Sequence, residues 1–185
     1  LAEMGSRLIS AAKKTGIGIT LVPIFYQKGG FSKPAQENQR RFISDRVDDY
    51  LKLFDSSEKA CEEYENASVG VGIHSMRAVE CEAIVEVARS FAEEVPFHIH
   101  ISEQLAEVED CEANLGKRPV RWILDHLDLS DRFHFVHATH LDESEIRDLA
   151  RSQTNVVLCP TTEGNLGDGL FPLREFQNAG GNWSV

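Results

Sequence analysis

The sequence is short of cysteine and has no long apolar run. Its four cysteines are widely spaced and form no CxxC motif, namely Cys61, Cys81, Cys111 and Cys159. A zinc site made of cysteines alone is therefore not expected, and reduced thiols in a cytoplasmic protein are the simplest interpretation. No apolar run approaches the roughly 20 residues of a membrane span, and no signal peptide is visible, so we expect no membrane partner.

Positive charge is also scarce. The chain has 19 Lys and Arg residues against 30 Asp and Glu residues, a net charge of −11. Such a balance argues against binding to nucleic acid or to an anionic membrane surface. It does not exclude a small anionic substrate, which needs only one or two local cations. With 185 residues, 42% of them hydrophobic, the chain can bury one sizeable core.

Apolar segments with strand character alternate with amphipathic segments of helical period. The predicted strands are 17–26, 67–74, 97–102, 133–138 and 155–159, with a sixth beginning near 182. The predicted helices are 2–14, 44–64, 79–94, 105–114, 118–127, 142–152 and 172–179. We expect strand 17–26 to be buried on both faces. Ser44 should cap the helix over 44–64, which has a possible break near 55–57. Asp142 should form a capping box with Glu145 at the start of the helix over 142–152. This alternation predicts an α/β protein with parallel strands.

Two parallel architectures remain, an open doubly wound sheet and a closed (β/α)8 barrel. No glycine-rich phosphate motif follows a predicted strand, which disfavours a dinucleotide-binding fold. Polar residues instead gather after nearly every strand, at Tyr26, His74 with Arg77, His100 with Glu103, His137 with His140, and 161–163. Barrel enzymes build their active sites in this way, so we expect part of a TIM-type barrel.

The HxxE pattern of His100 and Glu103 lies at the end of the FHIHIS strand, with His100 inside the strand and Glu103 directly after it. A neutral imidazole there can hold a metal ion, and a carboxylate three residues later can carry protons for a hydrolysis. The alternative is a buried histidine bonded to the backbone and a surface glutamate that starts a helix.

His137 ends the next predicted strand and would meet His100 at the rim of a barrel. It would orient an attacking water or hold a metal, or it would be an ordinary buried histidine. We expect structural roles for His140 and for His98, which shares the strand face of His100 but lies deeper. By alternation His134 should face the helices, and His126 should be solvated.

His74 and Arg77 suit the binding of a carboxylate, since a guanidinium grips an acid bidentately and the histidine adds a donor. Alternatively, Arg77 pairs with a glutamate of a neighbouring helix. The segment 159–169, CPTTEGNLGDG, is either a loop that closes over substrate or a glycine-rich turn.

Taken together, these residues resemble the amidohydrolase superfamily, and within it the branch that hydrolyses N-formimidoyl-L-glutamate in histidine degradation. The likeness covers nearly the whole chain. It is carried by LVPIFYQKGGF, ENQRRFI, GIHSMRAV, FHIHISEQLAEVEDC, KRPVRWI, FVHATHLDESE and LCPTTEGNLGDGLFPL.

The resemblance implies a (β/α)8 barrel that binds one zinc ion through His100. Glu103 would be the catalytic acid and base, and His137 would polarise the attacking water. His74 and Arg77 would bind the carboxylates of a small dicarboxylate substrate. The reaction would hydrolyse a formimino group to a formyl group and release ammonia, in a complete protein that is a homodimer.

Parts of that pattern are missing. The HxH pair that the superfamily carries after its first strand, the first two strands, and the aspartate after the eighth strand are not found in the sequence. We therefore expect residues 1–185 to be one partial barrel domain, from the third strand to the start of the eighth. One imidazole makes a poor zinc site, so this segment alone should bind little zinc and turn over no substrate.

Two other functions fit the sequence. The first is another deaminase or chlorohydrolase of the same superfamily. The second is a metal-free degenerate barrel with a binding role.

Overall fold

A six-stranded parallel sheet organises the computed structural model, which describes residues 2–185. Its strands, in spatial order, are β2 (Ile24–Phe25), β4 (Val71–Ile73), β5 (Phe97–Ile101), β6 (Phe133–His137), β7 (Asn155–Val157) and β8 (Asn182–Ser184). Spatial order follows chain order, and each neighbouring pair is parallel. This is the arrangement of successive units in a (β/α)8 barrel, as the sequence predicted. A separate parallel pair joins β1 (Ile19–Leu21) to β3 (Ala67–Val69).

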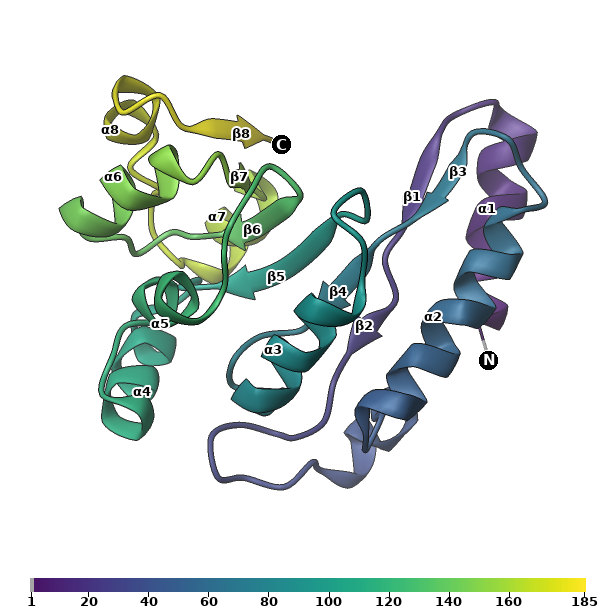
Figure 1. Cartoon of the computed structure of the whole chain (residues 1–185), viewed down its shortest axis with the longest axis horizontal. Helices are drawn as coiled ribbons and strands as arrows, with labels where there is room; N and C mark the ends of the chain where they lie inside the picture. Colours follow the sequence, from purple (N-terminus) through teal and green to yellow (C-terminus); the bar gives the residue numbers. More distant parts are fainter. Residues whose placement is uncertain (1) are drawn as a thin grey trace.

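Helices connect successive strands (Figure 1). They are α1 (Glu3–Thr15), α2 (Val47–Cys61), α3 (Cys81–Ser90), α4 (Leu105–Leu115), α5 (Pro119–His126), α6 (Glu143–Arg151), α7 (Pro160–Leu166) and α8 (Leu173–Asn178), with a 3-10 helix η1 (Glu37–Phe42). The capping box of Asp142 and Glu145 is confirmed. None of the helices in residues 2–185 has the length and apolar character needed to cross a bilayer.

The structure corrects several boundaries. The segment predicted as one strand over 17–26 is divided into β1 and β2 around Pro23, which has no N–H for a sheet ladder. It is not buried on both faces, because Thr20 is exposed. Ser44 does not cap α2, which starts after Arg46 and continues through 55–57 without a break. Residues 160–166, predicted as a loop, form α7 with Pro160 in its first turn.

One face of the sheet packs against the helices and forms the main core, with Phe97, Ile99 and Phe135 among its buried side chains. The opposite face, which we call the inner face, carries half-buried residues at alternating positions, namely His98, His100, His134 and Val136. The prediction that His134 faces the helices is therefore wrong. Its ring stacks on that of His98, with centroids 4.4 Å apart and 10° between the planes.

Candidate active site

The five residues singled out from the sequence lie together at the carboxyl ends of β4, β5 and β6. Ring centroids of His74 and His100 are 5.6 Å apart, and those of His100 and His137 are 5.7 Å apart. His137 Nε2 lies 3.4 Å from Glu103 Oε1, and Glu103 Oε2 lies 4.0 Å from Arg77 Nη2. Three imidazoles, a carboxylate and a guanidinium therefore form one continuous cluster.

His100 has the local geometry of a metal ligand. Its Nδ1 lies 2.8 Å from the carbonyl oxygen of His74, which places the proton on Nδ1 and leaves the lone pair on Nε2. Burial lowers the pKa of His100, while the hydrogen bond to the His74 carbonyl acts in the opposite direction. The lowered pKa favours the neutral ring, which is the form that binds a metal ion. Imidazole nitrogen is a good ligand for zinc, so His100 fits the ion that the resemblance implies.

His137 is held by an unusual backbone. Its register partner is Ile101, which faces the core, so simple alternation would direct His137 toward the helices. Instead, His137 and Ala138 have φ values of 72° and 49°, in the left-handed region that costs energy for residues other than glycine. This backbone turn ends β6 and lets the buried ring of His137 contact carboxylates on both sides.

Those two carboxylates belong to Glu103 and Glu163. Glu163 Oε1 lies 3.0 Å from His137 Nδ1 and also accepts a hydrogen bond from the amide of Cys159 at 2.8 Å. Only 8% of Glu163 is exposed. The bend from β7 into α7 thus supplies a buried acceptor to the ring that ends β6.

Glu107 supports Glu103 from the first turn of α4. It is 2% exposed, and its Oε2 accepts a hydrogen bond from the Glu103 amide at 3.0 Å. Burial raises the pKa of Glu107, while the charge of Arg77 acts in the opposite direction. Glu107 therefore holds the turn that carries Glu103 through this hydrogen bond.

His74 presents an uncharged ring beside His100. Burial, with smaller effects from His100 and Arg77, lowers the pKa of His74 to about 4. Its ring meets Tyr26 edge to face, with centroids 4.5 Å apart, and its Nδ1 lies 3.0 Å from Ser75 Oγ. A neutral imidazole of this kind can donate or accept one hydrogen bond to a ligand.

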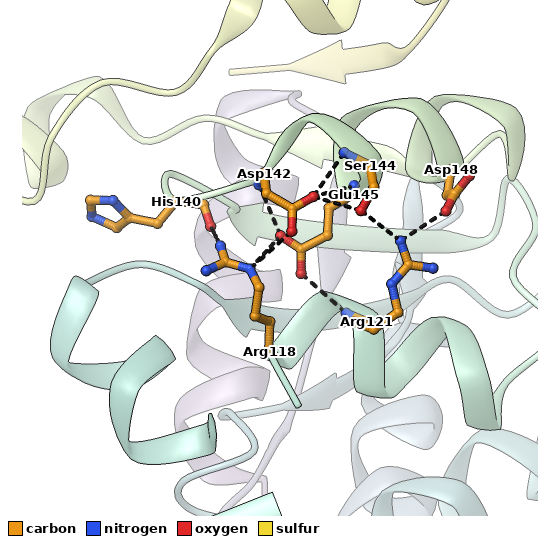
Figure 2. A network of polar contacts seen from close by, with 7 residues as sticks. All are labelled: Arg118, Arg121, His140, Asp142, Ser144, Glu145 and Asp148. Atoms are coloured by element: carbon orange, nitrogen blue, oxygen red, sulfur yellow. Dashed lines mark hydrogen bonds and ion pairs between the residues drawn. The ribbon is translucent and has the colours of Figure 1, made fainter. Parts of the chain in front are cut away.

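His140 stands apart from this cluster, as expected. Its Nε2 lies 2.7 Å from the carbonyl oxygen of Asp168, and its own carbonyl accepts a hydrogen bond from Arg118 at 2.6 Å. Figure 2 shows His140 at the edge of a polar network between α5 and α6. His140 thus links that network to the segment after α7. His98 lies one layer below His100 on β5 and stacks on His134, in keeping with a structural role.

His137, Cys159 and Glu163 also place a nitrogen, a sulfur and an oxygen within 4.8 Å of one another, which is a possible metal group. One observation disfavours it. Glu163 Oε1 is already engaged by two nitrogens, His137 Nδ1 and the Cys159 amide. Hydrogen bonding accounts better for these three residues.

Sequence reasoning did not assign individual roles to Glu107 and Glu163. Glu163 belonged to the polar group after the fifth strand, but 159–169 remained open between a lid and a turn. The available signal was spacing: each glutamate lies four residues beyond a strand-end residue, Glu103 or Cys159. At the start of a helix, that spacing lets a carboxylate reach back to an amide.

Comparison with known proteins places this cluster in a class. The sequence profile described as the Amidohydrolase family matches residues 6–184, so the chain belongs to the amidohydrolase family. A formimidoylglutamate deiminase of Pseudomonas aeruginosa is 42% identical over all 185 residues of this chain, which span 40% of that protein. A 5-methylthioadenosine/S-adenosylhomocysteine deaminase of Natronomonas pharaonis is 36% identical over 109 residues, 58% of this chain and 25% of that protein.

Solved structures agree on the fold. An amidohydrolase from Brucella melitensis superposes with a TM-score of 0.90 at 43% identity, covering 100% of this chain and 41% of that one. An adenosine deaminase from Xanthomonas campestris, solved with bound zinc, superposes with a TM-score of 0.81 at 22% identity. The match covers 98% of this chain and 39% of that one. The α/β fold is thus that of part of an amidohydrolase barrel, and this chain spans about two fifths of those structures.

Proposed function

We propose that this chain is a segment of a zinc-dependent deiminase that hydrolyses N-formimidoyl-L-glutamate to N-formyl-L-glutamate and ammonia. The observation that carries the proposal is the continuous cluster of His74, His100, His137, Glu103 and Arg77 at adjacent strand ends. The 42% identity to part of a formimidoylglutamate deiminase, over all 185 residues of this chain, supports the choice of substrate.

His100 would hold zinc through Nε2, since Nδ1 is engaged by the His74 carbonyl. The ion, when bound, supplies Lewis-acid activation of water at neutral pH. Glu103, 15% exposed at its side chain, takes up a proton and delivers it to the leaving nitrogen. His137 Nε2, 3.4 Å from Glu103, hydrogen bonds to the reacting oxygen.

Arg77 and His74 would bind the carboxylates of the glutamate portion. The Arg77 side chain is 31% exposed, so a ligand can reach it. A carboxylate bound there would sit close to Glu103 and hold the formimino group near the proton-transferring residue.

We infer that His100 is one ligand of a larger set. In this proposal the HxH pair, the remaining aspartate and the first strands of the barrel come from parts of the protein outside residues 1–185. The coverage of 40% of the Pseudomonas protein supports this division. The 185-residue segment alone should then bind less than stoichiometric zinc and show no turnover.

The test is purification of the full-length protein, metal analysis, and measurement of ammonia release from N-formimidoyl-L-glutamate. We expect about one zinc per chain and loss of activity when the metal is chelated. Arg77→Ala should raise KM for this dicarboxylate by roughly 10- to 100-fold, the value of one or two charge-assisted hydrogen bonds. The matched control, Arg46→Ala, removes an exposed arginine from outside the cluster and should leave KM unchanged.

The second candidate is deamination of a purine nucleoside, which the 36% identity to a methylthioadenosine deaminase favours. Turnover of such a nucleoside, with no dependence on Arg77, would select it. A full-length protein that binds no metal and turns over neither substrate would favour the metal-free binding role instead.

A further inference from the structure

The His137 ring lies between two carboxylates, and only one of them has been given a chemical role. Glu103 Oε1 faces Nε2 at 3.4 Å, and Glu163 Oε1 faces Nδ1 at 3.0 Å. The Nδ1 contact is the shorter one and is buried. The ring itself is only 4% exposed, so solvent does not compete strongly for either nitrogen.

We propose that Glu163 is a positioning residue for His137: it accepts a hydrogen bond from Nδ1–H and thereby fixes the ring with Nε2 toward Glu103. This inference rests on the proposed function, because it assumes that Nε2 of His137 meets the reacting atoms. It adds a residue from the β7–α7 bend, to which no role had been assigned.

Glu163 is itself held in place. Its Oε1 accepts the amide N–H of Cys159 at 2.8 Å, and Glu163 lies in the first turn of α7, where the amide dipoles favour a negative charge. Pro160 starts that helix. The acceptor is thus oriented by backbone rather than by a mobile side chain, as a positioning residue requires.

The need for such a residue follows from the strand end. The left-handed backbone of His137 and Ala138 brings the ring away from the position that alternation would give it. A histidine on a strained turn has two tautomers and can rotate its ring unless one nitrogen is engaged. As an acceptor, Glu163 selects the Nδ1–H tautomer and keeps the Nε2 side of the ring toward Glu103. The buried aspartate of serine protease triads has the same effect on its histidine.

The decisive experiment is a double-mutant cycle in the full-length protein, using Glu163→Gln, His137→Asn and both together. Glu163→Gln keeps an oxygen that can accept from the Cys159 amide, so the thermal midpoint should change little. We expect kcat to fall by about 10- to 100-fold with KM within about threefold, as for other residues that orient a functional histidine. In the His137→Asn background, Glu163→Gln should change kcat less than about twofold. Glu175→Gln, an exposed glutamate on α8, is the matched control.

Equal losses from Glu163→Gln in both backgrounds would overturn the proposal, because Glu163 would then act without His137. Loss of a second, stoichiometric metal ion from the Glu163→Gln variant would also overturn it, in favour of the His137, Cys159 and Glu163 metal group.

Nitrogen NMR of histidine-labelled protein tests the same idea without substrate. We expect His137 to be protonated at Nδ1 in the wild type and to show mixed tautomers in Glu163→Gln. A wild-type ring protonated at Nε2 alone would contradict the positioning role, even if the variant failed to fold. Since this readout needs no turnover, it separates failure of the inference from failure of the proposed substrate.

Discussion

Arg118 and Glu145 form an ion pair in which the acid is fully buried. Arg118 Nε lies 2.9 Å from Glu145 Oε2, and the two side chains are 25% and 0% exposed (Figure 2). Glu145 also accepts hydrogen bonds from the amides of Asp142 and Arg121, at 3.0 and 3.3 Å. The pair therefore joins α5 to α6 and to the turn that carries His140.

Arg118→Met should destabilise the protein strongly, because it leaves the buried carboxylate of Glu145 without its cation. Removing one member of a buried pair typically costs about 3–5 kcal/mol. Urea unfolding of the full-length protein measures the loss. The matched control is Arg121→Met, whose partner Asp148 is 37% exposed, and it should cost less than about 1 kcal/mol. Similar losses for both variants would show that burial of Glu145 does not decide the effect.

Glu107→Ala should lower both stability and activity. The substitution leaves the partly buried amide of Glu103 unpaired, at a cost of about 1–3 kcal/mol. It also frees the turn that positions the Glu103 carboxylate, so kcat should fall more than KM changes. Thermal unfolding and steady-state kinetics measure the two effects. Glu109→Ala, exposed on the same helix, should leave both unchanged.

The acidity of Glu107 gives a separate prediction. Burial raises its pKa in the folded protein above the unfolded value, so the folded state holds the proton more tightly. Its contribution to stability is therefore complete below the unfolded pKa and is lost as the pH rises through the folded pKa. Unfolding free energies measured from about pH 4 upward should show this decline, and the decline should be smaller in Glu107→Gln. If the unfolding free energy of the variant depended on pH as that of the wild type does, Glu107 would not be the source of the decline.

Gly72→Ala should destabilise the packing of the edge strand β2 against β4. A Cβ at this position would lie 2.6 Å from Ile24 Cδ1 and 2.8 Å from the carbonyl oxygen of Pro23. Overpacking of this kind costs about 1–3 kcal/mol. Gly164→Ala is the control: it lies in α7 with nothing within 4 Å of the added carbon, and should be neutral or stabilising by up to about 1 kcal/mol. Denaturant unfolding distinguishes the two, and a tolerated Gly72→Ala would mean that β2 can move.

The thiols of Cys81 and Cys111 should react slowly in the folded protein, and they should make the protein less stable at alkaline pH. Burial raises the pKa of Cys111 to about 12 and that of Cys81 to about 11, from 9.0. Above about pH 9 the unfolded chain loses these protons while the folded chain keeps them, so stability falls as the pH rises. Alkylation of the thiols at pH 8 should be slow until denaturant is added. Cys111→Ala should reduce the fall in unfolding free energy at alkaline pH. Rapid labelling of Cys111 in the native protein would contradict its burial.

The sequence predicted the strand order and the cluster because both follow from local patterns. Alternating apolar and amphipathic segments predict parallel strands, and parallel strands bring their carboxyl ends to one edge. The nearness of His100 and Glu103 to His74 and Arg77 therefore follows from the sequence pattern alone. The boundaries failed where one residue broke a segment, as Pro23 does between β1 and β2.

The face of the sheet that His134 occupies and the backbone turn that orients the His137 ring could not be predicted, because side-chain alternation assumes extended backbone. His134 stacks on His98 on the inner face, while His137 leaves the alternation through a φ of 72°. Nothing in the letters FHFVHATH marks that turn. Left-handed backbone at a non-glycine residue is maintained by its surroundings, here the contacts of His137 with Glu103 and Glu163.

By itself, the sequence determined which residues could carry chemistry and which edge of the sheet they would share, because residue type and strand period are local properties. Only the tertiary structure decided how the rings are oriented: which nitrogen of His100 is free, and which carboxylates flank His137. Those choices depend on contacts between residues 26 positions or more apart, such as His100 with His74 and His137 with Glu163. No local pattern encodes such contacts.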